Sequence, residues 1–213
     1  MSFLMRAPRE CASWEWELDA FTAPGLEPAL MTAARMSAVL REHGLLEADV
    51  LEWMWFVHGV GGIGVLTRLP VMGRFDTAEL ARRIRRSRPV GYPDAQVGPI
   101  AVTGTGTWFD AEGGERRERD LVVLTVDPDE HALTADVEVF HDIWGRYDFR
   151  GVPHPDVQRR NAPRLAAALR ALDSLLGTPA RPGEPTYFGC AEGYGIAEPD
   201  EIDGLGPDLT DQL

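Results

Sequence analysis

Residues 13–21 read Ser-Trp-Glu-Trp-Glu-Leu-Asp-Ala-Phe, and apolar and polar side chains alternate through most of this stretch. In an extended strand successive side chains point to opposite faces, so Trp14, Trp16 and Leu18 share one face. The other face carries the acids Glu15, Glu17 and Asp19. The stretch therefore predicts a half-buried strand with an acidic outer face.

Further strands are predicted downstream, where apolar and aromatic residues cluster between turn residues. An apolar, aromatic run at 50–57 precedes a glycine-rich turn, and 63–71 is its expected hairpin partner. The remaining strand segments are 97–110, 120–126 and 132–140. Short Gly- and Pro-containing turns separate these three segments, which predicts an antiparallel meander.

Three segments have helical signals. Residues 28–44 have Pro28 in the first turn and Gly44 as the expected C-terminal cap. The spacing of Asp76 and Glu79 is that of a capping box for a second helix. A third helix is expected over 155–176, split or kinked near 161–163, where Asn161 can cap a new start, and it carries an apolar stripe. The stripe consists of Leu165, Leu169, Leu172 and Leu176.

We therefore predict an α+β fold in a single domain over residues 1–213, with a twisted, mainly antiparallel sheet packed against about three helices. Residues 192–213 form an acidic tail that contains seven acids and no arginine, and the sequence leaves open whether this tail is ordered. The N-terminus has neither the features of a signal peptide nor an apolar run of membrane length, so a cytoplasmic protein that does not enter a membrane is expected. Cys11 and Cys190 are expected to be free thiols.

Charge narrows the range of functions. The net charge is −13, and all 21 basic residues are arginine. Because the chain contains no lysine, it can have neither a lysine that forms a Schiff base with a substrate nor the lysine of a phosphate-binding P-loop. The negative charge opposes binding to nucleic acid and favours association with a basic partner.

The glycines at 59–64 match the pattern G-x-G-x-x-G of dinucleotide-binding proteins. That site requires a helix directly after the last glycine, whereas residues 65–70 have strand character and end in proline. The segment is therefore expected to be a turn, and no cofactor is predicted.

Titratable residues crowd the region of His141, Asp142 and His154. Their spacing matches no known metal-binding motif, so no metal site is predicted. No catalytic residue is assigned, although His141 and Asp142 or Asp148 remain an alternative acid–base pair. A small enzyme or a ligand-binding domain built on this region, with Arg146 or Arg150, is the alternative function.

The C-terminal half contains three segments in succession: W-x-x-Y-D-x-R-G at 144–151, N-A-P-R-L at 161–165 and P-T-Y-F-G at 185–189. This order resembles uncharacterised small proteins of GC-rich bacteria, some of which resemble immunity partners of polymorphic toxins. The resemblance covers about residues 140–190 and brings no catalytic residues with it.

The resemblance and the charge together predict a cytoplasmic immunity or inhibitor protein that neutralises a basic partner such as a toxin. Its oligomeric state is left open, and the sequence more readily indicates a binding protein than an enzyme. The residues expected to contact the partner are Trp144, Arg146, Tyr147, Asp148, Arg150, Glu15, Glu17 and Asp19. The aromatic residues among them could instead pin their loop onto the sheet.

Overall fold

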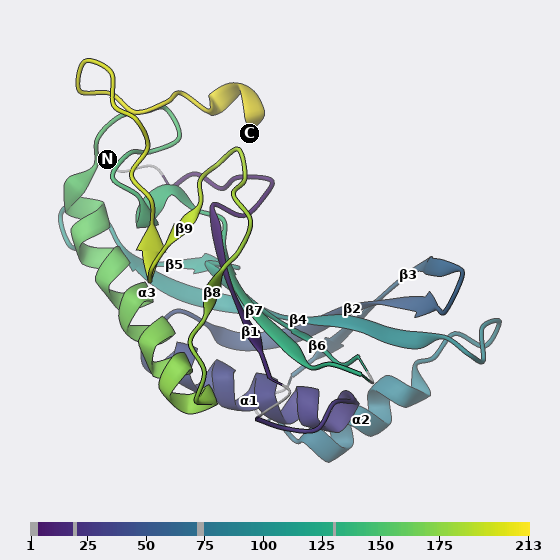
Figure 1. The fold of residues 1–213 in the computed structure, drawn as a ribbon. Coiled ribbons are helices and arrows are strands. Elements are labelled where there is room, and N and C mark those ends of the chain that lie inside the picture. Colours follow the sequence, from purple (N-terminus) through teal and green to yellow (C-terminus); the bar gives the residue numbers. More distant parts are fainter. Residues whose placement is uncertain (1–3, 19–20, 72–74, 130) are drawn as a thin grey trace.

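The alternating N-terminal stretch forms strand β1 (Ala12–Glu17), and its two tryptophans are completely buried. The computed structural model describes residues 4–18, 21–71, 75–129 and 131–213. Asp19 lies outside this described part. The predicted α+β fold is confirmed, since helices lie against a large sheet whose strand pairs are all antiparallel (Figure 1).

The sheet has the strand order β3-β2-β4-β6-β7-β1-β8, and β5 also pairs with β4. Its strands are β1, β2 (Glu47–Val57), β3 (Gly61–Pro70), β4 (Gln96–Phe109), β5 (Glu115–Arg119), β6 (Val122–Asp127), β7 (Thr134–Val139) and β8 (Arg181–Pro182). A separate hairpin consists of β9 (Ala191–Glu192) and β10 (Gly195–Ile196). The helical elements are α1 (Leu26–Glu42), α2 (Thr77–Arg86), α3 (Pro155–Leu176) and the short 3-10 helices η1 (Asp142–Trp144) and η2 (Thr210–Gln212).

The long central strand β4 is rich in glycine because other backbone lies very close to it. A Cβ atom at Gly104 would lie 2.0 Å from the carbonyl oxygen of Glu47, and one at Gly106 would lie 2.3 Å from that of Leu45. Only glycine permits such an approach. The glycine-rich segment at 59–64 lies at the β2–β3 hairpin, but the turn itself is shorter than predicted, because residues from Gly61 onward already belong to β3.

The helices lie on one side of the sheet, and the opposite side carries none of them (Figure 1). Helix α1 packs on β2, β4 and β6, while α2 and α3 both contact α1. The buried face of the sheet supplies most of the fully buried tryptophans, and Trp144 comes from η1. The fully buried tryptophans of the molecule are Trp14, Trp16, Trp53, Trp55 and Trp144.

Two predictions about helices are confirmed. Asp76 caps α2, and its carboxylate accepts a hydrogen bond from the backbone N–H of Glu79 at 3.0 Å. The leucine stripe of α3 is buried, with Leu169 and Leu172 fully inaccessible. Helix α3 packs against α1, β4 and η1. The helix that contacts β6 is α1.

The predicted split of the third helix is wrong, because α3 runs as one helix from Pro155 to Leu176 with Pro163 inside it. Asn161 does not cap a new helix. Its fully buried amide nitrogen donates to the carbonyl oxygens of Phe109 and Val157, both at 2.8 Å, and its oxygen accepts from the N–H of Phe109 at 2.9 Å. These contacts with β4 hold the helix in place where proline removes a backbone hydrogen bond.

Among the described residues, no helix is long and apolar enough to cross a lipid bilayer.

We predict that Leu169→Ala lowers the free energy of unfolding by about 2–5 kcal/mol, through lost burial and the cavity left behind. Ser174→Ala, at an exposed position of the same helix, should change it by less than about 0.5 kcal/mol. Urea melts of both variants measure these values. A loss below about 1 kcal/mol for Leu169→Ala would show that the stripe contributes little to the core.

Candidate functional site

The loop between β7 and α3 carries most of the residues that the sequence predicts at an interface. It begins with η1 and continues into a tight turn that is closed by a β-bridge between Tyr147 and Pro153. The predicted residues in this loop are Trp144, Arg146, Tyr147, Asp148 and Arg150. Trp144 is 1% exposed and Asp148 is 6% exposed. Tyr147 is 8% exposed, so these three side chains are largely closed to a partner as the loop stands, and the burial of Trp144 in the core fits the alternative in which the aromatic residues pin the loop.

Asp148 organises the turn. One carboxylate oxygen accepts the backbone N–H groups of Arg150 at 2.9 Å and Val152 at 3.0 Å. The other accepts the Nη2 and Nε groups of Arg150 at 2.6 and 3.0 Å. Both guanidinium donors therefore share one carboxylate oxygen in a charge-assisted contact, while the second oxygen holds the backbone of the turn. Asp148 and Arg150 therefore shape the loop through each other.

Arg146 and Tyr147 bind the acidic tail. The Tyr147 hydroxyl donates to Glu201, and the guanidinium of Arg146 lies 3.6 Å from Glu198 and 3.8 Å from Glu201. Further along, the N–H of Leu209 donates to the carbonyl oxygen of Phe149 at 2.7 Å. The tail is thus packed against the loop, which answers the question of its order that the sequence left open.

Glu15 and Glu17 lie elsewhere, on the open face of the sheet. Glu17 forms a bidentate ion pair with Arg181 of the edge strand β8. The loop follows β7, whose last residue, Val139, pairs with Ala12 at the start of β1. Glu15 and Glu17 lie further along β1, away from the loop. The predicted contact residues therefore fall into two separate groups, one in the loop and one on the sheet.

On the open face, Glu15 belongs to a cluster of carboxylates. Glu15 pairs directly with Asp136 of β7, and Glu138 follows two residues further along the same strand. Directly paired residues of an antiparallel ladder project from the same face, so these three acids are neighbours. In the described chain, none of the three forms an ion pair with an arginine, although Arg181, the direct ladder partner of Glu15 on β8, lies on the same face and pairs with Glu17. We call Glu15, Asp136 and Glu138 the acidic sheet face.

Burial and mutual repulsion shift the ionisation of this cluster. Burial, followed by the charges of Glu15 and Asp127, raises the pKa of Asp136 to about 6. Burial, followed by the charges of Asp136 and Glu10, raises the pKa of Glu138 to about 7. Both carboxyls therefore resist ionisation in the folded chain, and both lack a positive neighbour that would reverse the shift.

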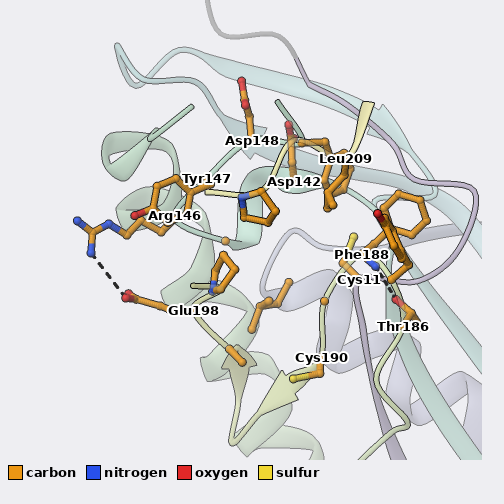
Figure 2. Close-up of a pocket in the computed structure, with 18 of the residues that line it drawn as sticks. Cys11, Asp142, Arg146, Tyr147, Asp148, Thr186, Phe188, Cys190, Glu198 and Leu209 are labelled. Carbon is orange, nitrogen blue, oxygen red and sulfur yellow. Dashed lines mark hydrogen bonds and ion pairs between the residues drawn. The ribbon is translucent and has the colours of Figure 1, made fainter. Parts of the chain in front are cut away.

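A cavity of about 300 Å³ lies where the loop, the N-terminal segment and the C-terminal segments meet. Figure 2 shows Cys11 and Phe188 on one side of the cavity, and Arg146 and Glu198 on the other. Much of the lining is aromatic or aliphatic, with Phe149, Phe188, Ile196 and Leu209 contributing. This volume and composition are within the range of small-molecule sites.

The sequence only partly anticipated this cavity. His141, Asp142, Arg146 and Asp148 line it, whereas His154 does not appear in its lining. The ring of His154 bonds to the carbonyl oxygen of Gly145 at 3.0 Å. Cys11 and Leu209 were missed because they come from opposite ends of the chain. The segment 185–189 was visible as P-T-Y-F-G, and it supplies one wall.

The innermost titratable groups favour their uncharged forms. Burial, then the charge of Arg6, lowers the pKa of His141 to about 4. Burial raises the pKa of Asp142 to about 7, with a smaller contribution from the charge of Asp148, and backbone hydrogen bonds such as that from Met5 oppose the shift. Burial also raises the pKa of the Cys11 thiol, helped by the charges of Asp142 and Glu10. At neutral pH this side of the cavity therefore holds little charge.

Two buried polar atoms in this lining have no hydrogen-bond partner within the described chain: Nδ1 of His141 and Oδ2 of Asp142. The other oxygen of Asp142 accepts from the N–H of Met5 at 3.2 Å. His141 and Asp142 are thus not joined as an acid–base pair. Among the described residues, no group of three or more His, Cys, Asp or Glu side chains is placed to hold a metal ion.

We predict that Asp142→Asn stabilises the protein in a pH-dependent way. The pKa of this carboxyl is about 7 in the folded chain and ordinarily 3.8, so its ionisation destabilises the fold increasingly between these pH values. Relative to wild type, the variant should gain on the order of 1–3 kcal/mol at pH 8 and almost nothing near pH 4. Urea melts at pH 4, 6 and 8 test this, with the exposed Asp200→Asn as control. An equal difference at every pH would contradict it.

Both cysteines are free thiols in the structure, and only Cys11 is buried.

Comparison of this chain with protein-family models, with characterised proteins and with solved structures finds no match. The arguments for function therefore come from the geometry of this chain.

Proposed function

We propose that this protein is a cytoplasmic immunity or inhibitor protein that binds and neutralises a basic partner, such as a toxin, through its acidic sheet face. The observation that supports the proposal is the cluster of Glu15, Asp136 and Glu138 on the helix-free side of the sheet (Figure 1). This surface retains Glu15 from the contact residues predicted from the sequence and leaves out the loop residues, because these are engaged within the chain.

The cluster costs stability in the free protein. The pKa values of Asp136 and Glu138 are raised first by burial and then by the repulsion of nearby carboxylates, so ionisation of both groups is unfavourable in the free fold. An arginine or lysine from a partner would favour ionisation of both groups. Part of the energy lost in the free chain would then return as affinity.

The overall charge of −13 points to the same kind of partner. It accelerates the approach of a basic protein and repels a phosphate backbone, so a nucleic acid is not the proposed partner. The loop contributes less to this proposal. Arg146 and Arg150 are about half exposed, but each already contacts a carboxylate of this chain.

The test compares two triple variants of equal net charge. One carries Glu15→Gln, Asp136→Asn and Glu138→Gln on the sheet, and the other carries Glu192→Gln, Asp200→Asn and Asp203→Asn in the exposed tail. Immobilised wild-type protein and the tail variant should capture the same basic protein from a lysate of the source organism. The sheet variant should lose at least about tenfold in affinity, the size of two weak ion-pair contacts.

Co-expression then tests neutralisation. The captured protein, produced alone in a bacterial host, should arrest growth, and the wild-type chain should restore it. Loss of capture by both triple variants would assign binding to net charge rather than to the acidic sheet face. Undiminished capture by the sheet variant, or a partner without any inhibitory activity, would contradict the proposal.

We also predict that affinity for this partner rises with pH. At pH 5.5 the carboxyls of Asp136 and Glu138 are largely protonated, since their pKa values are about 6 and about 7, and at pH 8 both are ionised. Arginine stays charged throughout. Titration calorimetry at the two pH values should show tighter binding at pH 8 for wild type and a much smaller difference for the sheet variant. The free energy of unfolding should change in the opposite direction, because ionisation of these groups destabilises the free fold.

A second candidate function is binding of a small molecule in the cavity beside His141 and Asp142. The specific observation in its favour is a concave, largely apolar site that contains two unpartnered buried polar atoms. Such a site differs from the acidic sheet face in both position and chemistry.

A further inference from the structure

The walls of the cavity are held in place before any ligand arrives. The hydroxyl of Thr186 donates to the carbonyl oxygen of Glu10 at 2.6 Å and accepts from the N–H of Phe188 at 3.1 Å. The rings of Phe149 and Phe188 contact edge to face, with their centroids 5.7 Å apart. A site built this way loses little conformational freedom when it is filled.

Charged groups in the lining are already paired. Arg146 contacts Glu198 and Glu201, and Figure 2 shows its guanidinium directed away from the cavity towards Glu198. Asp148 is bound by Arg150. The cavity therefore offers no free guanidinium to a phosphate or a carboxylate, and its outer carboxylate, Glu198, is directed towards Arg146 rather than towards a ligand.

The inner wall is close to neutral as well. His141 and the Cys11 thiol remain uncharged at neutral pH, and Asp142 is only partly ionised. Burying a charged ligand group against such a wall would cost desolvation energy that no opposite charge offsets. An uncharged group avoids this cost.

Hydrogen-bonding capacity remains beside the cavity. His141 and Asp142 are 1% and 3% exposed, and each has a side-chain atom without a partner in the described chain. Buried polar groups are almost always satisfied, so unsatisfied ones in a cavity lining indicate a missing partner. A ligand with one hydroxyl or amide group could supply it.

We propose that this cavity binds a small, uncharged molecule that has an aromatic ring and one hydroxyl or amide group. The ring would lie among Phe149, Phe188 and Leu209, and the polar group would lie towards His141 and Asp142. This inference deepens the second candidate function and rests on it.

The experiment uses four probes with the same ring system: 1-naphthylmethanol, 1-methylnaphthalene, 1-naphthylmethylamine and 1-naphthylacetate. Titration calorimetry and ligand-observed NMR on the full chain should detect binding of 1-naphthylmethanol. The cationic and anionic probes should bind at least about tenfold more weakly, because each buries an unpaired charge.

Two variants locate the bound probe. Ala197→Trp adds a large side chain at a lining position and should abolish binding, whereas Val90→Trp adds the same side chain at a fully exposed position and should leave binding unchanged. Independently of any mutation, bound 1-naphthylmethanol should slow alkylation of Cys190, which also lines the cavity. This second measurement holds even if Ala197→Trp does not fold.

The polar contact is tested by His141→Phe. Removal of the ring nitrogens should lower the affinity for 1-naphthylmethanol by roughly three- to tenfold, the range for one hydrogen bond. The affinity for 1-methylnaphthalene should stay within about twofold of the wild-type value. An equal loss for both probes would show that His141 acts only through packing and would overturn the polar part of the proposal.

The remaining outcomes separate the ligand class from the site itself. If no probe binds, or if binding leaves Cys190 unprotected, the cavity is not a ligand site and the second candidate function fails. If a charged probe binds within twofold of 1-naphthylmethanol or more tightly, and does so at this site, the small-molecule function stands and the uncharged class is wrong.

Discussion

The sheet must bury one face against the helices, and this constraint sets the chemistry of both of its faces. Trp14 and Trp16 project into the core from β1, so Glu15 between them projects to the open side. The same alternation in β7 places Asp136 and Glu138 beside it. A shift of the register by one residue would bury these acids and expose the tryptophans, which makes the register strongly specified. The acidic sheet face therefore follows from the burial of the opposite face.

A single carboxylate connects this core to the cavity. Asp173 of α3 accepts from Trp16 Nε1 at 2.8 Å, from the N–H of Ala180 at 2.9 Å and from the Tyr194 hydroxyl at 2.6 Å. These donors come from β1, from the segment after α3 and from the β9–β10 hairpin. The C-terminal segment is thereby directed back across the edge of the sheet. Its next residues, together with Cys11, complete the cavity wall.

The two proposed binding regions use electrostatics in opposite ways. On the open face, burial and then the charges of nearby carboxylates raise the pKa values of Asp136 and Glu138, and the free protein is less stable for it. In the cavity, burial drives His141 and Cys11 to their uncharged forms, and the nearby charges are paired. A polycationic surface suits the first environment and an uncharged molecule suits the second. Since different elements build the two regions, an occupant of one does not fill the other.

The sequence by itself determined the elements whose signals are local. Three such signals are the alternation around Glu15, the cap at Asp76 and the leucine stripe of α3. Each depends only on residues that are close in the sequence, so the α+β fold could be predicted. It could not determine that Asn161 would bond to a distant strand and hold an unbroken helix, or that Trp144 would be buried. The sequence could not predict the cavity either, because the walls of the cavity come from both ends of the chain. Such contacts depend on how packed elements meet in space, and only the tertiary structure decides that.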